Sequence, residues 1–203
     1  MTQRVLAGIT VSLDGYYTGP NDRLGSGLGD GGERLHYWVF GGPWTYESGA
    51  RGEPAPEDKA YLEPTFRTAG AMLVGRTMYD AAGGWGDDPG FGVTAFVLTH
   101  RPVETQHKGN TTFEFVTQGL DVALQKARKA AGGKDVLVMG GGDLIRQSLD
   151  AGVLDELTLS IAPILLGSGK RLFDGVRRLD LTFDRVEIVA SPFVTHLRYQ
   201  VRR

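Results

Sequence analysis

The chain reads Val136-Leu-Val-Met-Gly-Gly-Gly-Asp-Leu-Ile-Arg-Gln-Ser-Leu149 at its most informative point. A short apolar run, typical of a buried strand, stops there at three consecutive glycines. Apolar residues from Leu144 onward then recur at the spacing of one helix face, and Gly152 ends this pattern. The order predicts a buried strand, a tight turn and a helix whose N-terminus faces whatever lies against the turn.

The three glycines admit two interpretations. Bare backbone N–H groups at the positive end of a helix dipole suit a phosphate or pyrophosphate. Glycine also permits positive φ and close packing of strand on helix without any ligand. The turn matches neither the Gly-x-Gly-x-x-Gly motif nor the P-loop, which ends in Lys-Ser or Lys-Thr. The residues alone therefore indicate a nucleotide site. The alternative is that the glycines only allow a tight turn between the strand and the helix and bind no ligand.

The composition is that of an ordinary globular protein, with 203 residues, 41% hydrophobic and 23% charged. A net charge of −2 gives no electrostatic reason to expect nucleic acid or a membrane as a partner. The absence of cysteine excludes disulfides, thiolate catalysis and Cys-based metal sites, and we expect no metal. No run resembles a signal peptide or approaches the ~20 apolar residues of a membrane span, so we expect a cytoplasmic protein.

Strand and helix patterns alternate along the chain. Two loops rich in Gly, Pro, Asp and Asn cover residues 19–34 and 41–56, and a short candidate helix over residues 35–40 lies between them. Pro56, followed by two acidic residues, marks the start of a longer helix. The predicted strands cover residues 5–13, 71–74, 95–98, 112–116, 136–139 and 154–162, and the predicted helices cover residues 56–68, 76–82, 120–131 and 144–149.

The C-terminal residues follow a different pattern. Apolar and polar residues alternate over residues 195–201, which indicates a half-buried strand. The segment 181–189 breaks this phase as a bulged strand does, and Ser191-Pro192 joins the two as an antiparallel hairpin. Alternating strands and helices followed by a hairpin predict an α/β domain with a mostly parallel sheet and an antiparallel edge. We expect residues 1–203 to form a single domain.

Five segments, in this order, resemble the dihydrofolate-reductase-like superfamily, and within it the reductase domain of bacterial riboflavin-biosynthesis enzymes and its stand-alone relatives. The resemblance implies a three-layer α/β/α fold with a mostly parallel central sheet and a C-terminal antiparallel hairpin. Its most specific part is the pairing of a Gly-Arg-Thr turn with the triple glycine, each after a strand. The segments are Ser12–Gly15, Leu73–Tyr79, Val97–Arg101, Val138–Asp143 and Pro163–Phe173.

The resemblance also implies a function. It indicates an NADPH-dependent oxidoreductase that transfers hydride to a C=N or C=O bond of a small heterocycle, pyrimidine-like or pterin-like. The activity would be of the phosphoribosylaminouracil-reductase or dihydrofolate-reductase type, in a homodimer. The alternatives are a non-catalytic NADP(H)-binding or redox-sensing protein, and a scaffold that has lost the cofactor, because fold resemblance alone fixes function poorly.

The residues assigned to the cofactor suit NADPH chemically. Arg76 and Arg101 each follow a strand, and an arginine pairs with a 2′-phosphate through two parallel charge-assisted hydrogen bonds. The alternative is that both are solvated surface charges. Asp143 is expected to cap its helix rather than to touch a phosphate, because like charges repel. The cofactor residues implied by the resemblance are Gly75, Arg76, Thr77, Thr99, His100, Arg101, Gly140, Gly141, Gly142, Asp143 and Leu144.

The substrate side is assigned to aromatic residues and a glycine loop. Tyr16 and Tyr17 are expected to form a wall beside the nicotinamide or a planar substrate. Trp85, isolated among glycines, is either a lid residue over the site or a core anchor. The loop of Gly167, Ser168 and Gly169 resembles the family's loop at the substrate end of the cleft.

Candidate catalytic groups are few. Dihydrofolate reductases carry a carboxylate on their first helix. The short predicted helix here offers only His36, with Glu33 at its edge, which disfavours folate reduction. His36 is a candidate proton donor near neutral pH, or else a packed or surface histidine. Asp14 positions a substrate or a flanking loop, or bonds its own backbone in a turn. Lys170 and Arg171 are available for a substrate phosphate, or are surface charges.

Overall fold

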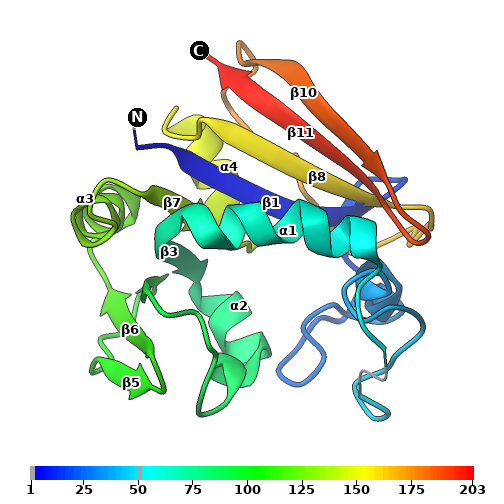
Figure 1. The fold of residues 1–203 in the computed structure, drawn as a ribbon, viewed down its shortest axis with the longest axis horizontal. Coiled ribbons are helices and arrows are strands. Elements are labelled where there is room, and N and C mark those ends of the chain that lie inside the picture. Colours follow the sequence, from blue (N-terminus) through cyan, green and yellow to red (C-terminus); the bar gives the residue numbers. More distant parts are fainter. Residues whose placement is uncertain (1–2, 50–51) are drawn as a thin grey trace.

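A sheet of nine strands forms the middle layer of the fold within residues 3–49 and 52–203, which the computed structural model describes (Figure 1). Residues 50–51, in the predicted loop 41–56, lie outside the described residues. A two-stranded sheet pairs β2 (Tyr16–Thr18) with β9 (Lys170–Arg171). The nine strands are β1 (Val5–Ser12), β3 (Ala69–Gly75), β4 (Thr94–Leu98), β5 (Gln106–Lys108), β6 (Thr111–Val116), β7 (Asp135–Val138), β8 (Glu156–Ala162), β10 (Thr182–Ala190) and β11 (Thr195–Arg202).

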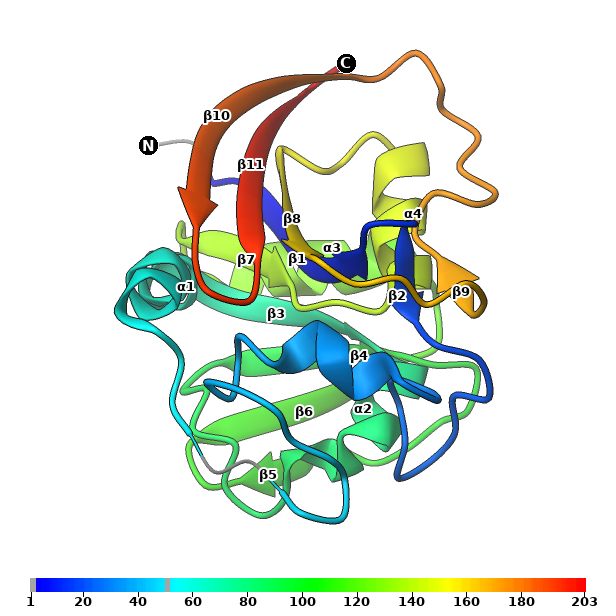
Figure 2. The same cartoon turned by 90° about the vertical axis from the view of Figure 1, so that its right-hand side faces the viewer.

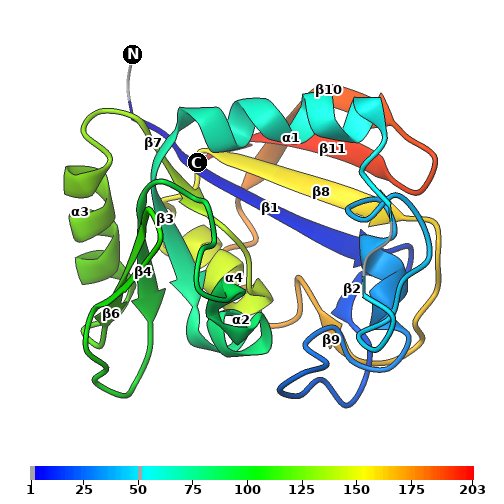
Figure 3. The same cartoon turned by 60° about the horizontal axis from the view of Figure 1, so that its bottom comes forward.

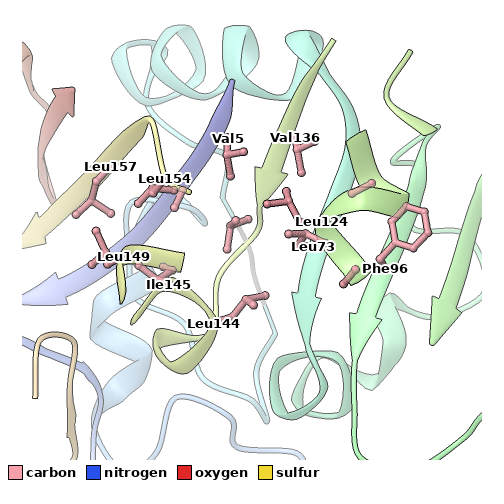
Figure 4. Packing of buried hydrophobic residues seen from close by; sticks show 14 of the residues in the cluster. Val5, Leu73, Phe96, Leu124, Val136, Leu144, Ile145, Leu149, Leu154 and Leu157 are labelled. Carbon is pink, nitrogen blue, oxygen red and sulfur yellow. The ribbon is translucent and has the colours of Figure 1, made fainter. Parts of the chain in front are cut away.

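Helices cover both faces of this sheet. The α-helices are α1 (Pro56–Thr68), α2 (Arg76–Ala81), α3 (Leu120–Ala130) and α4 (Gly142–Asp150), and two 3₁₀ helices are η1 (Gly32–His36) and η2 (Gly83–Trp85). The larger hydrophobic cluster joins α3 and α4 to one face (Figure 4). A second cluster joins Tyr79 of α2 to the other face, along which α1 also runs beside β1, β8 and β11 (Figure 3). The predicted three-layer α/β/α fold is confirmed.

The central strands are buried on both faces, which explains their near-continuous apolar sequences. Along β1, Val5 and Ala7 enter the larger cluster while Leu6 enters the second. Strand β7 is buried at every residue. The predicted strands around the triple glycine and around residues 5–13 therefore form the centre of the sheet, where burial stabilises most strongly.

The strand order is β10-β11-β8-β1-β7-β3-β4-β6-β5, parallel from β8 to β6. The predicted hairpin of β10 and β11 is confirmed, with the expected bulge between Arg185 and Glu187. Figure 2 shows this pair curving away from the central strands. Antiparallel pairing occurs at both edges, because β5 also pairs antiparallel with β6.

Several short elements differ from the expectation. The helix predicted over residues 35–40 is wrong: η1 ends at His36, and residues 37–40 form turns. Gly31 opens η1 in the left-handed region at φ 70°, and the fully buried Leu35 anchors it. Strands β2, β5 and β9 were not predicted, because elements of two or three residues form through pairing and carry no periodic pattern. Within the described residues, no helix combines the length and apolar character that crossing a membrane requires.

Candidate functional site

A cavity of about 900 Å³ opens where the central parallel strands end. Strand β3 pairs with both β4 and β7, so the turns after these three strands lie side by side. The turns form one end of the cavity, and residues from η1, the segment after it and α1 form the other. This is the edge of an open α/β sheet at which ligands ordinarily bind.

The glycine turn lies at the first end. Gly141 adopts a φ of 85°, a left-handed conformation that favours glycine, and its carbonyl accepts the first hydrogen bond of α4 from Leu144 at 3.0 Å. A Cβ atom on Gly142 would lie 2.3 Å from Cε1 of Tyr17, so the ring packs directly on the turn. The N–H groups of Gly142 and Asp143 belong to the first turn of α4 and have no intrahelical acceptor. Backbone donors therefore face the cavity at the positive end of a helix dipole.

Asp143 does not cap α4, which corrects the expectation from the sequence. The N-terminal cap is Gly141, without a side-chain hydrogen bond, and Asp143 already lies inside the helix. Its carboxylate forms an ion pair with Arg146 three residues on, the helical spacing at which side chains meet. Arg146 also donates to the carbonyls of Arg171 and Leu172 at 3.1 and 3.3 Å. The negative charge of Asp143 beside the turn is thus offset.

The two predicted phosphate-binding arginines differ in their surroundings. Arg76 donates from Nε to both carboxylate oxygens of Asp80 at 2.8 Å, so its guanidinium is already oriented and paired. Arg101 is exposed, and its side chain makes no ion pair with any residue in 3–49 or 52–203. Its backbone N–H donates to Oγ1 of Thr99 at 3.2 Å, which fixes the turn after β4. Arg101 is therefore the freer cation of the pair.

The structure gathers all the residues assigned to the cofactor around this one cavity, although they come from three separate turns. Their roles stay predictions, since no ligand contact tests them. The cavity-lining residues of this set are Gly75, Arg76, Thr77, Thr99, His100, Arg101, Gly140, Gly141, Gly142, Asp143 and Leu144.

The residues assigned to the substrate divide into two groups. Tyr17 and Trp85 line the cavity, whereas Tyr16 and the loop of residues 167–169 do not. The Tyr16 hydroxyl donates to the carbonyl of Gly167 at 3.3 Å, so this ring belongs to the loop's own packing. Trp85 packs on Phe91 and Phe113, with ring centroids 5.4 and 6.1 Å away, which favours the core-anchor interpretation.

Asp14 holds a flanking loop and does not line the cavity. Its carboxylate accepts hydrogen bonds from the Ser12 hydroxyl at 2.6 Å and from the N–H groups of Leu166 and Gly167 at 3.2 and 2.7 Å. Desolvation opposes ionisation, yet these hydrogen bonds lower the pKa of Asp14 to about 2. Of the roles considered from the sequence, the contacts favour the positioning of a loop.

The two candidate acids of the short helix are placed differently. Glu33 does not line the cavity, and its carbonyl accepts the indole N–H of Trp44 at 3.0 Å. His36 lines the cavity, but burial lowers its pKa to about 4. An imidazole with this pKa is neutral at pH 7, so the interpretation of His36 as a protonated donor near neutral pH is not supported.

The second end of the cavity is lined by aromatic residues that sequence reasoning missed. Trp38 donates its indole N–H to the Thr10 hydroxyl at 3.0 Å, and the Tyr61 hydroxyl donates to Thr158 at 3.2 Å. Flat walls with hydroxyls at their base suit a planar ring that carries polar edges. The aromatic lining residues at this end are Trp38, Phe40, Trp44, Tyr46, Tyr61 and Phe66.

A buried polar group lies behind this end, and it was also missed. His196 donates or accepts at both ring nitrogens, with Nε2 2.8 Å from Asp58 Oδ1 and Nδ1 2.8 Å from the Ser160 hydroxyl. Asp58 resembled an ordinary acid of a helix N-terminus, and His196 belonged to the polar half of an alternating strand. Nothing in the sequence links residues 138 positions apart.

Comparisons with known proteins agree with this architecture. A family model described as the RibD C-terminal domain matches residues 3–195. The uncharacterized protein YyaP of Bacillus subtilis strain 168 is 30% identical over 115 residues, which are 53% of this chain and 61% of that protein. The chain thus spans less than two thirds of YyaP.

Two solved structures share the fold. A candidate riboflavin biosynthesis protein from Shewanella sp. PV-4 has a TM-score of 0.73 and 22% identity, covering 99% of this chain and 100% of that chain. Dihydrofolate reductase from Enterococcus faecalis, solved with NADP(H) and RAB-propyl, has a TM-score of 0.58 and 16% identity, covering 98% and 97%. The fold is therefore dihydrofolate-reductase-like.

Proposed function

Because the chain belongs to the RibD C-terminal domain family, we propose that it is an NADPH-dependent reductase of the riboflavin-biosynthesis type. The substrate is a small heterocycle, pyrimidine-like or pterin-like, that accepts hydride at a C=N or C=O bond. One observation carries this proposal: a single cavity joins a glycine turn and a free arginine at one end to aromatic walls at the other. A dinucleotide and a flat ring bound together in such a cavity would lie in contact.

The chain's own residues fit the cofactor. The N–H groups at the start of α4 suit the pyrophosphate, and the ion pair of Asp143 with Arg146 reduces repulsion of an anion there. Arg101 is available for a 2′-phosphate, which distinguishes NADPH from NADH. Bound NADPH supplies the hydride, and the protein supplies orientation and exclusion of water.

A titration of the nucleotide fluorescence tests the cofactor site. We expect micromolar binding of NADPH, and Arg101→Ala should weaken it about tenfold, because a charge-assisted hydrogen-bond pair is lost. Binding of NADH should not change. Arg67→Ala is the matched control, since Arg67 is exposed on α1 and does not line the cavity. Failure to bind either nucleotide would remove the basis for the proposal.

Oxidation of NADPH in the presence of a dihydropterin or an aminopyrimidine tests the reaction itself. Consumption of NADPH that depends on the heterocycle supports the reductase. Tight NADPH binding without any such consumption supports the alternative, a non-catalytic NADP(H)-binding or redox-sensing protein.

A further inference from the structure

Three hydroxyl and imidazole side chains form a row across neighbouring strands beneath the aromatic end of the cavity. Thr10 of β1 pairs in register with Ser160 of β8, and Ser160 pairs with His196 of β11. Residues opposite each other in a sheet project from the same face, so these side chains are adjacent. Ser160 lines the cavity, whereas His196 and Asp58 lie behind it.

Asp58 of α1 lies next to His196 in this row, and its side chain is completely buried, which is unusual for an aspartate. One carboxylate oxygen contacts His196, and the other, Oδ2, has no hydrogen-bond partner among the described residues. A carboxylate in the interior is costly unless a positive charge compensates it. The imidazole of His196 is the adjacent group that can carry that charge.

Aromatic rings hold His196 in place. Tyr61 stacks on the imidazole with the ring centroids 4.1 Å apart, and Trp38 meets it edge-on at 4.9 Å. Both rings also line the cavity. The imidazole is therefore fixed between Asp58 and Ser160, and its side-chain torsions have little freedom to break either contact.

The protonation state of His196 determines what Ser160 presents to the cavity. In the neutral imidazole, Nε2–H donates to Asp58, and Nδ1 accepts the hydroxyl proton of Ser160. In the imidazolium, Nδ1–H donates to the Ser160 oxygen instead, and the hydroxyl proton becomes free to point into the cavity. Protonation of His196 thus changes what Ser160 offers to a ligand in the cavity. The hydroxyl changes from a hydrogen-bond acceptor into a hydrogen-bond donor.

We propose that Ser160 is the catalytic proton donor of the reduction, and that His196 and Asp58 are positioning residues that reload it. This inference rests on the proposed reductase function. The substrate carbon receives hydride from the reduced nicotinamide cofactor as its bond to nitrogen becomes single. The nitrogen takes the hydroxyl proton of Ser160, and Ser160 takes the Nδ1 proton of His196. The step ends with a neutral imidazole and the Asp58 carboxylate, and a proton from water restores the charge on His196.

The other predicted acids do not compete with this relay. Asp14 and Glu33 do not line the cavity. Burial lowers the pKa of His36 with no carboxylate to oppose it, whereas Asp58 opposes the same shift in the pKa of His196. Ser160 is the hydroxyl that joins the aromatic end of the cavity to a buried titratable pair. A serine hydroxyl alone is too weak an acid for this step, which is why the coupled imidazolium matters.

The pH dependence follows from the groups around His196. Burial lowers its pKa below the ordinary value, and Asp58 and the more distant Glu187 of β10 oppose that shift. Because the pKa is lowered, the charged, loaded form declines with rising pH at lower pH values than for an ordinary histidine. Turnover should therefore fall with rising pH. The other titratable or charged groups that face the pair are Tyr61 from α1, Glu156 from β8, Arg198 from β11 and, across the cavity lining, His36.

Two measurements test the relay, and the first requires no turnover. Long-range ¹H–¹⁵N NMR spectra of histidine, recorded from about pH 5 to about pH 9, report the tautomer and titration of each imidazole. We expect neutral His196 to carry its proton on Nε2 and to take up a second proton toward the acidic end. Asp58→Asn should change this tautomer, while Ser160→Ala should leave the Nε2 proton in place. A His196 that stays neutral throughout, or that carries its proton on Nδ1, would overturn the proposal.

The second measurement uses NADPH oxidation with a dihydropterin as the probe. Ser160→Ala should lower kcat about a hundredfold or more, leave NADPH binding unchanged and remove the fall of turnover with rising pH. His196→Gln should have the same effects on kcat and on the pH profile as Ser160→Ala. The matched control is His107→Gln, because His107 is exposed. Wild-type kinetics in Ser160→Ala would overturn the relay while leaving the reductase intact.

The outcomes that refute the proposed reductase function differ from those that refute only the proposed proton relay. A wild-type chain that binds no NADPH refutes the proposed function, and the relay falls with it. A chain that binds NADPH but reduces no dihydropterin is judged by the NMR titration, which supports the relay if His196 titrates in the expected tautomer and overturns it otherwise.

Discussion

Asp14 shows at the scale of one residue how a turn carboxylate organises a loop far away in the sequence. Its lowered pKa, about 2, means that the folded protein favours the ionised form more than the unfolded chain does. A carboxyl group whose pKa is lowered by folding stabilises the folded protein at pH values above its pKa in the unfolded chain, which is about 3.9. That contribution is lost as the pH falls from about 4 toward about 2.

Asp14→Asn should therefore lower the free energy of unfolding at neutral pH, because the amide cannot accept all three hydrogen bonds. The difference from wild type should shrink as the pH falls through this window. Urea unfolding followed by circular dichroism at several pH values measures it. A difference that stays constant down to about pH 2 would contradict the role given to the carboxylate.

Gly142 is the residue at which the glycine turn has least room for a side chain. Gly142→Ala should place its methyl group against the Tyr17 ring and destabilise the protein by about 1 to 3 kcal/mol. The double variant with Tyr17→Ala should recover part of this loss, because the clashing ring is gone. Thermal unfolding of the single and double variants measures the coupling, and strict additivity would show that the contact carries no energy.

The limits of sequence reasoning are also clear at this scale. The turns after β3, β4 and β7 could be identified from the sequence as candidate cofactor turns, because each one directly follows a strand and contains glycine or arginine. The role of Asp58 was not found, because its significance depends on His196, which reaches it only through the sheet register. Pattern reasoning treats a histidine in the polar half of a strand as solvated, whereas packing of α1 on that face buries it completely.

The element that closes the aromatic end of the cavity is α1. Tyr61 projects from it onto His196 and Thr158, and the guanidinium of Arg198 lies over the Tyr61 ring, 5.0 Å from its centroid. Asp58 and Tyr61 are the buried residues of α1, and Tyr61 is the large one, so the packing of this helix depends strongly on Tyr61.

Tyr61→Ala should cost about 3 to 5 kcal/mol, the range for removal of a large buried aromatic. Tyr61→Phe should cost only about 1 kcal/mol, because it keeps the ring and loses one hydrogen bond. Chemical denaturation of wild type and of both variants measures the loss in the free energy of unfolding for each substitution. Equal losses would mean that the hydroxyl, and not the stacked ring, holds α1.

Long elements were predictable and short ones were not. The helix that begins at Pro56, and the strand and helix flanking the glycine turn, follow clear periodic patterns, and each was predicted close to its true bounds. The 3₁₀ helix η1 and the strand β9 contain at most five residues, so tertiary contacts decide them.

For the molecule as a whole, strand β10 at the sheet edge leaves Val186 and Ile188 about half exposed, at 54% and 53%. Exposed apolar residues on a long edge strand invite pairing with another chain. We propose that the expected homodimer forms through this strand. Ile188→Glu should shift the protein toward monomer in sedimentation velocity, whereas Leu24→Glu, an exposed residue in a loop, should not. A wild-type monomer would refute this assembly.

The cavity as a whole could be only half predicted from the sequence. The end with the glycine turn is built from three strand–turn units that parallel pairing brings to one edge, a consequence of the fold class. The aromatic end is lined by residues of η1, α1 and β8, with β11 behind β8, and these elements meet only in the finished fold.

The central claim is that one cavity holds NADPH with its nicotinamide beside the aromatic end. A crystal structure of the protein with NADP(H) tests it most directly. We predict the pyrophosphate on the turn of Gly140 to Gly142, the 2′-phosphate at Arg101 and the nicotinamide ring facing Ser160. A nicotinamide that points away from Ser160, or a nucleotide bound outside this cavity, would contradict the account.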